Sequence, residues 1–237
     1  MTSKGAGTGF ELLSRNTDEY GKKGVLIKAL NTYVLPYISK NKLLEIGSGF
    51  GNLTVILSKL FSETAIVEPN RKFFKNVTNL IKCKGFNKRW EDVQMGKDKF
   101  DLILAVHVLY YIPKKVWLRQ IGRMLSVLGK NGKLVIVLQS KASRLYSFPD
   151  KFLKHESRIN SEELMQILHD AGIKFTSHKL KTEIWANTKK EAEIIGKFLF
   201  DTHNVPMDSK KAIDLWNYKR GAKFFVDNRQ HLIVITK

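Results

Sequence analysis

The feature that most constrains this chain is the stretch 43–53, LLEIGSGFGNL, in which three glycines stand at alternate positions. Apolar residues at strand spacing precede the glycines, and apolar residues at helical spacing follow them as far as Leu60. Glycine tolerates positive φ and lets a ligand approach the backbone where any Cβ would collide. Strand, glycine turn and helix in this order predict a doubly wound α/β fold with a ligand-binding loop. A glycine-rich turn without a ligand is the alternative.

Two acidic residues indicate which ligand such a loop would hold. Glu45 stands just before the first glycine, where it would repel a pyrophosphate and would suit a cation, such as the sulfonium and amino group of S-adenosylmethionine. Glu68 follows the second predicted strand, about 20 residues beyond Gly47, a spacing at which doubly wound folds bind an adenosine ribose. The sequence therefore predicts a positively charged adenosine cofactor at these residues: Glu45, Gly47, Ser48, Gly49, Glu68 and Pro69.

The order of the predicted elements indicates one domain over residues 1–237, long enough for a sizeable core. We expect strands at 42–46, 64–67, 86–89, 100–106, 133–139, 174–185 and 232–236, with helices between them. This pattern is typical of a Rossmann-like sheet of seven mostly parallel strands, with the last strand antiparallel and helices on both faces. A helical insertion, 188–220, precedes the last strand.

The residues before the first strand are expected to form a cover. A helix over about 16–38, capped by Asn16 or Thr17, would serve as a lid on the cofactor pocket. Residues 1–9 are rich in Gly, Ser and Thr, and we expect them to be mobile without a ligand.

Residues that follow the central strands are candidates for ligand contacts, because ligands bind outside the carboxyl ends of parallel strands. One group follows the third strand, where adenine would lie, although its tryptophan could equally be a core residue: Trp90, Glu91 and Asp92. The other group follows the strand 100–106 and should face the substrate: His107, Tyr110 and Tyr111.

The amino-acid composition limits the kinds of partner that this chain is expected to bind. The formal net charge of +19 would suit nucleic acid, since phosphate binding is largely electrostatic. However, 32 lysines outnumber nine arginines and form no long basic run, which favours solvated lysine faces over phosphate recognition. We therefore expect a small-molecule partner, with nucleic acid as the alternative.

The single cysteine, Cys83, excludes an internal disulfide and favours a reducing compartment. The sequence has neither an apolar run of about 18 residues for a membrane span nor an apolar signal core at its start. We expect a cytoplasmic monomer without a metal.

Several segments together carry a resemblance to a known family. The block 44–53, Glu68 and the segment 101–112 resemble class I S-adenosylmethionine-dependent methyltransferases. Five further segments are similar to the histamine N-methyltransferase family: HVLYY at 107–111, GKLVIV at 132–137, SEEL at 161–164, LHDAGIKF at 168–175, and the tail FVDN to LIVI over 225–235. The resemblance covers residues 17–237 loosely. It implies an N-methyltransferase that acts on a small amine or imidazole and leaves S-adenosylhomocysteine.

The resemblance also implies roles for single residues. The cofactor would contact Gly47, Gly49 and Glu68, with residues 90–92 at the adenine and Val106 on its flank. The acceptor would contact Tyr110, Tyr111, Phe198 and Asn228. Asp18, with Glu19 beside it, takes the place of an amine-binding glutamate, and His107 takes that of a glutamine. Tyr146 and Phe148 stand where the family has paired tryptophans.

The predicted catalytic residues are then Asp18, His107 and Asn228. A carboxylate of Asp18 or Glu19 would bind the cationic end of an amine. His107 or Asn228 would orient the reacting nitrogen, and His107 could alternatively accept its proton. Two other functions stay open: methylation of RNA or another macromolecule, and cofactor binding without catalysis.

Overall fold

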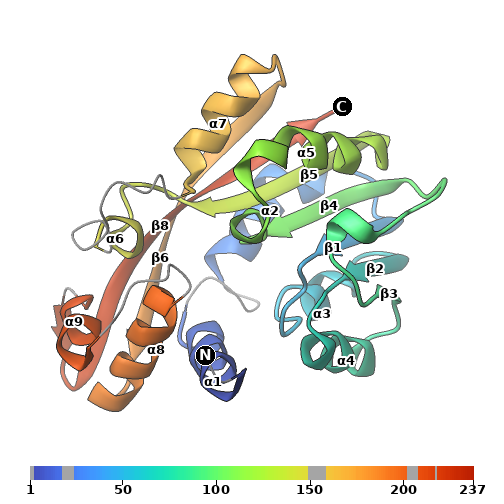
Figure 1. The fold of residues 1–237 in the computed structure, drawn as a ribbon. Helices are drawn as coiled ribbons and strands as arrows, with labels where there is room; N and C mark the ends of the chain where they lie inside the picture. The colour runs from blue at the N-terminus through green and yellow to red at the C-terminus, as the bar shows by residue number, and fades with distance from the viewer. Residues whose placement is uncertain (1–2, 18–23, 149–158, 202–207, 217) are drawn as a thin grey trace.

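Eight strands of the described residues form one sheet, in the order β3-β2-β1-β4-β5-β8-β6 with β7 paired to β8 (Figure 1). The structure is a computed structural model, and it describes residues 3–17, 24–148, 159–201, 208–216 and 218–237. The strands are β1 (Lys42–Ile46), β2 (Glu63–Val67), β3 (Lys84–Phe86), β4 (Phe100–Val106), β5 (Leu128–Gln139), β6 (Phe175–Ala186), β7 (Tyr218–Arg220) and β8 (Lys223–Thr236).

The helices surround this sheet. The α-helices are α1 (Ser3–Arg15), α2 (Val25–Tyr33), α3 (Thr54–Leu57), α4 (Arg71–Leu80), α5 (Trp117–Ser126), α6 (Arg144–Ser147), α7 (Ser161–Asp170), α8 (Lys189–Asp201) and α9 (Ser209–Asp214). Short 3₁₀ helices are η1 (Leu35–Tyr37), η2 (Trp90–Asp92), η3 (Leu109–Tyr111) and η4 (Lys114–Val116). Among the described residues, none of the helices is both long and apolar enough to cross a membrane.

Each face of the central sheet has its own hydrophobic core. On one face, α5 and α7 pack through residues such as Trp117 and Leu164. On the other face, α2 and α3 pack through residues such as Leu30 and Leu57. Because both faces are covered, the central strand β4 is almost continuously apolar, as expected for a parallel strand in such a fold.

Strand direction determines where a ligand can bind. β1 is parallel to β2 and β4, and β5 is parallel to β4, so their carboxyl ends meet at one edge. β8 is antiparallel to both β5 and β6. This arrangement confirms the predicted Rossmann-like fold with an antiparallel last strand.

Beyond the carboxyl edge, β6 and β8 continue as a two-stranded arm, which we call the β6–β8 extension (residues 181–186 and 223–229). The pairing of β5 with β8 ends at Gln139 and Gln230, whereas that of β6 with β8 continues to Ala186 and Phe224. A third hydrophobic cluster, from α6, α8 and α9, covers one face of the extension. The extension and its helices therefore project past the sheet edge where ligands are expected (Figure 1).

Several predicted boundaries were wrong. The last strand begins at Lys223 rather than at 232, and the predicted insertion ends in a strand, β7, that the sequence did not indicate. The third strand is residues 84–86 rather than 86–89. Before the first strand, α1 begins at Ser3, within the residues 1–9 that were expected to be mobile without a ligand. Thr17, the expected cap of a helix over about 16–38, forms an isolated bridge with Ile184, and the next helix begins at Val25.

Candidate active site at the carboxyl edge of the sheet

The glycine loop joins β1 to α3 and has a backbone that side chains would disrupt. Gly47, Gly49 and Gly51 have φ of 75°, 53° and 83°. A Cβ built on Gly47 would lie 2.5 Å from Cγ2 of Val108, and one on Gly51 would lie 2.8 Å from Cγ2 of Val77. The loop therefore packs closely against the segment after β4 and against α4, which only glycine permits.

Glu68, at the end of β2, holds this loop in place. Its Oε2 accepts a hydrogen bond from the Gly49 N–H at 2.9 Å, and its Oε1 accepts one from the Asn70 N–H at 2.8 Å. Burial raises the pKa of Glu68, while these two bonds oppose the rise. A carboxylate has about four lone-pair sites, so acceptor positions are left for two ribose hydroxyls. The geometry thus fits the predicted ribose contact.

Glu45 and Ser48 are buried beside the loop with unsatisfied polar atoms. In the part of the chain that the structure describes, Glu45 Oε2 and Ser48 Oγ have no hydrogen-bond partner. Burial raises the pKa of Glu45 to about 8, against the opposing effect of the nearby Thr54 hydroxyl and with the charge of Glu68 adding to it. Buried polar groups are normally paired, so these atoms fit a ligand that carries a positive centre. The residues present therefore fit S-adenosylmethionine.

On the adenine side, Trp90 lies in the core, the alternative that the sequence left open. Its side chain is buried, and the Arg123 guanidinium lies 5.1 Å from its ring centroid. Arg123 Nη1 also donates to the carbonyl oxygens of Trp90 and Glu91, at 3.3 and 3.0 Å, and so holds η2 against α5. Two other predicted cofactor residues are more accessible: Asp92 is exposed, and Val106 is half-buried at the end of β4.

His107 directly follows β4 and has an unusual backbone. Its φ is 57°, and among the described residues it is the one non-glycine residue with positive φ. Its N–H donates to the Val137 carbonyl at 3.0 Å, and its ring stacks on Tyr110 with centroids 5.8 Å apart and planes 12° apart. A non-glycine residue in the left-handed region is strained, and such strain is concentrated at functional sites.

Tyr110 ties the end of β4 to the end of β5. Its hydroxyl accepts a hydrogen bond of 2.6 Å from the backbone N–H of Gln139. Its neighbour Tyr111 points outward, with 72% of the residue exposed. The two tyrosines therefore differ: one belongs to the framework of the site and the other lies on its rim.

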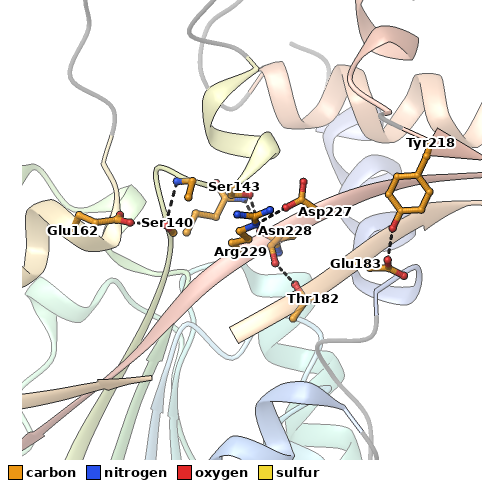
Figure 2. Close-up of polar contacts among 11 residues, drawn as sticks. Ser140, Ser143, Glu162, Thr182, Glu183, Tyr218, Asp227, Asn228 and Arg229 are labelled. Atoms are coloured by element: carbon orange, nitrogen blue, oxygen red, sulfur yellow. Dashed lines mark hydrogen bonds and ion pairs between the residues drawn. The ribbon is translucent and has the colours of Figure 1, made fainter. Parts of the chain in front are cut away.

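Asn228 lies inside β8, at the base of the β6–β8 extension, and is buried (Figure 2). Its Oδ1 accepts long hydrogen bonds from Ser143 Oγ at 3.4 Å and Gln139 Nε2 at 3.5 Å, and its carbonyl accepts one from Thr182 Oγ1 at 2.9 Å. The structure thus brings Asn228 near Tyr110 through Gln139, which contacts both.

Three other predicted acceptor residues pack between elements instead. The Tyr146 hydroxyl accepts a hydrogen bond from Asn160 Nδ2 at 2.9 Å. Phe148 is buried in the hydrophobic cluster of the extension. Phe198 faces α1, where a Cβ on Gly9 would lie 2.4 Å from the Phe198 Cβ. Asp18 and Glu19 lie outside the described residues.

The sequence reasoning missed the role of α1, which links the glycine loop to the extension. Asn52 Nδ2 donates to Ser14 Oγ at 2.5 Å, next to the loop. At the other side, the carbonyl of Asn16 accepts from the Trp185 N–H of β6 at 2.9 Å, and its side chain donates to Glu191 of α8 at 3.1 Å. The helix and the residue after it therefore span the region between loop and extension.

Comparisons with known proteins agree with this geometry. A family described as "Methyltransferase domain" matches residues 18–178. Ribosomal RNA small subunit methyltransferase A of Mycoplasmopsis synoviae (strain 53) is 28% identical over 208 residues, which are 86% of this chain and 72% of that protein.

Two solved structures show the same fold. The YcgJ protein from Bacillus subtilis has a TM-score of 0.61 at 14% identity and covers 90% of this chain and 98% of its own. The N-methyltransferase NodS from Bradyrhizobium japonicum WM9, bound to S-adenosyl-L-homocysteine, has a TM-score of 0.52 at 13% identity and covers 90% and 83%. None of these matches names histamine, so that finer resemblance stays a prediction. The family match spans more than half of the chain, and the glycine loop, Glu45 and Glu68 fit the cofactor: the chain belongs to the methyltransferase domain family and is a class I S-adenosylmethionine-dependent methyltransferase.

Proposed function

We propose that this methyltransferase acts on a nitrogen atom of a small molecule, an amine or an imidazole compound. The observation that carries the proposal is the parallel pair His107 and Tyr110, held at the end of β4. Val108, the next residue, contacts Gly47 of the loop, so the pair adjoins the cofactor site. An imidazole and a phenol at this position suit a planar or amine nitrogen.

The chain's own residues would prepare the cofactor. When bound, S-adenosylmethionine supplies an electrophilic methyl group for in-line displacement. Glu68 would accept the ribose hydroxyls, and the glycine loop that it holds through Gly49 would present its backbone to the cofactor. Glu45 and Ser48, whose oxygens lack protein partners among the described residues, would face its positively charged part.

The acceptor nitrogen must present an uncharged lone pair in line with the methyl group. His107 would orient this nitrogen or accept its proton through a ring nitrogen. Asn228 would donate to the acceptor through Nδ2, and Asp18 or Glu19 would bind a cationic end. Correct positioning alone contributes about 7–11 kcal/mol in favourable cases. Tyr110 and Tyr111 would line the acceptor side, while Tyr146, Phe148 and Phe198 would support it through packing.

The test is a methyl-transfer screen across histamine, other amines, imidazoles and amino acids, with product mass as the readout. We expect one class to gain a methyl group. A His107→Asn variant should lose about 100-fold or more in kcat if the imidazole accepts a proton. Tyr37→Phe, on the exposed surface, is the control and should keep full activity. Methylated RNA with no small-molecule product would overturn the proposal.

A second candidate, methylation of RNA, is favoured by two observations. The relative from Mycoplasmopsis synoviae is named as a ribosomal RNA methyltransferase, and the net charge of this chain is +19. Transfer of a labelled methyl group to total RNA tests this candidate directly. Label that stays with purified, intact RNA supports it, whereas label confined to small molecules excludes it.

A further inference from the structure

A chain of polar contacts connects α7 to the turn that follows β5. Glu162, in the first turn of α7, accepts a hydrogen bond from Ser140 Oγ through Oε1 (Figure 2). Its Oε2 accepts from the Lys141 N–H at 2.9 Å and from Ser161 Oγ at 3.1 Å. Partial burial would raise the pKa of Glu162, but these hydrogen bonds outweigh it and lower the pKa. The carboxylate is therefore ionised at neutral pH and can only accept hydrogen bonds.

Because Glu162 is ionised, the groups around it must be the hydrogen-bond donors. Ser161 has one hydroxyl proton, and it goes to Glu162. Ser161 Oγ also lies 2.8 Å from Nδ1 of His231, and with the serine proton directed to Glu162 this contact takes its hydrogen from the Nδ1–H tautomer of the ring. Burial lowers the pKa of His231, which favours the neutral ring. Hydrogen bonds from the β8 side, through His231 and Ser161, and from Ser140 after β5 thus converge on the Glu162 carboxylate of α7.

The turn held by Glu162 lies between two parts of the proposed acceptor site. Just before it, the Gln139 N–H donates to the Tyr110 hydroxyl at 2.6 Å. Within it, Ser140 accepts the Ser143 N–H at 2.9 Å through its carbonyl. Ser143 Oγ then donates to Asn228 Oδ1 at 3.4 Å. A shift of Ser140 would therefore move both contacts.

We infer that Glu162 is a positioning residue for methyl transfer: it fixes the 140–143 turn and, through that turn, the acceptor-side groups Tyr110 and Asn228. Its carboxylate is taken up by the hydrogen bonds from Ser140, Lys141 and Ser161. The inference rests on the proposed acceptor site but not on the identity of the acceptor. It also assigns α7 a part in the reaction, although this helix lies outside the glycine loop and the strands that bear the site.

The first experiment compares Glu162→Gln with Glu163→Gln. Glu163 is the adjacent residue on α7 and pairs with Lys114 at 3.1 Å, so its variant loses the same charge without touching the turn. We expect Glu162→Gln to lower kcat/KM for the acceptor about tenfold or more. Its dissociation constant for S-adenosylmethionine should stay within about twofold of wild type, because Glu162 does not contact the loop. The probe is histamine or total RNA, whichever the wild-type protein methylates.

A double-mutant cycle with Ser140→Ala tests the route of the effect. If Glu162 acts through Ser140, the double variant should be no slower than the slower single variant, because both remove one interaction. Multiplied losses would overturn the inference, as would an unchanged kcat/KM in Glu162→Gln. Should Glu162→Gln fail to fold, Ser140→Ala alone carries the same comparison against Glu163→Gln.

A measurement that needs no acceptor separates this inference from the proposed function. Amide hydrogen exchange over residues 139–143 should accelerate in Glu162→Gln and not in Glu163→Gln. Equal exchange in the two variants would overturn the positioning role. Methylation of RNA rather than histamine would instead overturn the small-molecule proposal, while the effect of Glu162→Gln on RNA methylation would still support the inference.

Discussion

At the residue scale, Glu45 should make cofactor binding depend on pH. Burial raises its pKa to about 8, and a bound positive centre would favour the ionised form. Binding below pH 8 should therefore release a proton, and affinity for S-adenosylmethionine should rise by up to about tenfold per pH unit toward pH 8. Calorimetry in two buffers with different ionisation enthalpies measures the proton release. The isosteric variant Glu45→Gln should show no release, and a pH-independent wild-type affinity would contradict the prediction.

The same carboxyl group should affect stability with the opposite sign. The pKa of a glutamate is ordinarily 4.5 and that of Glu45 is about 8 in the folded chain, so the folded state holds the extra proton between these values. The stabilisation that Glu45 contributes to the protein without cofactor is then fully present below about pH 4.5 and is lost as the pH rises toward and through 8. Thermal unfolding across this window should show the decline, and Glu45→Gln should reduce it. An unfolding temperature that rises with pH in the wild-type protein, but not in Glu45→Gln, would contradict the raised pKa of Glu45.

Glu68 should be the residue on which cofactor affinity depends most. Its removal takes away the ribose acceptor and also two hydrogen bonds that hold Gly49 and Asn70. Each hydrogen bond to a charged group contributes about 1.5–3 kcal/mol, so Glu68→Ala should weaken binding at least about tenfold. Glu63→Ala, at the other end of β2, is the control, because Glu63 is exposed and pairs with Lys42. Equal affinities in the two variants would exclude Glu68 from the cofactor site.

His107 should show opposite effects on stability and activity. Left-handed backbone geometry costs a non-glycine residue about 1–2 kcal/mol, which glycine avoids. His107→Gly should therefore be more stable to heat than His107→Ala, while both lose the imidazole and most of the activity. Calorimetric unfolding and turnover of the two variants check this. Equal unfolding temperatures would show that the backbone strain is relieved elsewhere.

At the element scale, α1 should slow cofactor release without being needed for the fold. Among the side chains that the structure describes, the buried members of both cores of the central sheet include none from α1. The helix nevertheless contacts the glycine loop through Ser14 and Asn52. A chain that begins at Asn16 should keep the circular dichroism of the sheet but release S-adenosylhomocysteine faster in stopped-flow experiments. Unchanged release would remove α1 from the site.

The elements differ in how well the sequence predicts them, for physical reasons. β1 and β4 have the predicted bounds because glycines or continuous apolar runs mark them. The cap of α7 also has a local sequence signal, because Asn160 stands three residues before Glu163 and its Oδ1 accepts from the Glu163 N–H at 2.9 Å. In contrast, α1 has a Gly- and Ser-rich start with weak helix propensity, and it is stabilised by packing on α8. The first half of β8 contains Asp227 and Asn228, which are poor strand formers, and pairing with β6 overrides them.

The residues of the candidate site also differ in how well the sequence predicts them. Glu68 and the glycines could be predicted because their spacing along the chain determines their geometry. His107 and Tyr110 follow from the rule that strand ends carry ligand contacts. Glu162 could not be found in this way, since its effect depends on a contact with Ser140 that only the packed α7 creates. Phe148 likewise has the character of a pocket residue but is buried in the cluster that includes α8.

At the scale of the whole molecule, the charge should produce only weak binding to nucleic acid. The lysines are dispersed, and several of the described ones pair with carboxylates, such as Lys42 with Glu63 and Asp98. We expect binding to total RNA to weaken by less than about tenfold between roughly 50 and 200 mM salt, as few phosphates are contacted. Filter binding across this range measures the slope. A loss of about a thousandfold or more would indicate a dedicated RNA surface and would favour the second candidate function.

The position of β8 has a consequence for how the protein is made. Among the named strands of the described residues, β6 pairs only with β8, and β8 lies between β6 and β5 although it follows both in the chain. During synthesis at about 5–20 residues per second, β5 and β6 therefore wait with unpaired edges until residues 223–236 have left the ribosome. The nascent chain can close its sheet only after synthesis of β8, which makes this interval the time at which it most needs a chaperone.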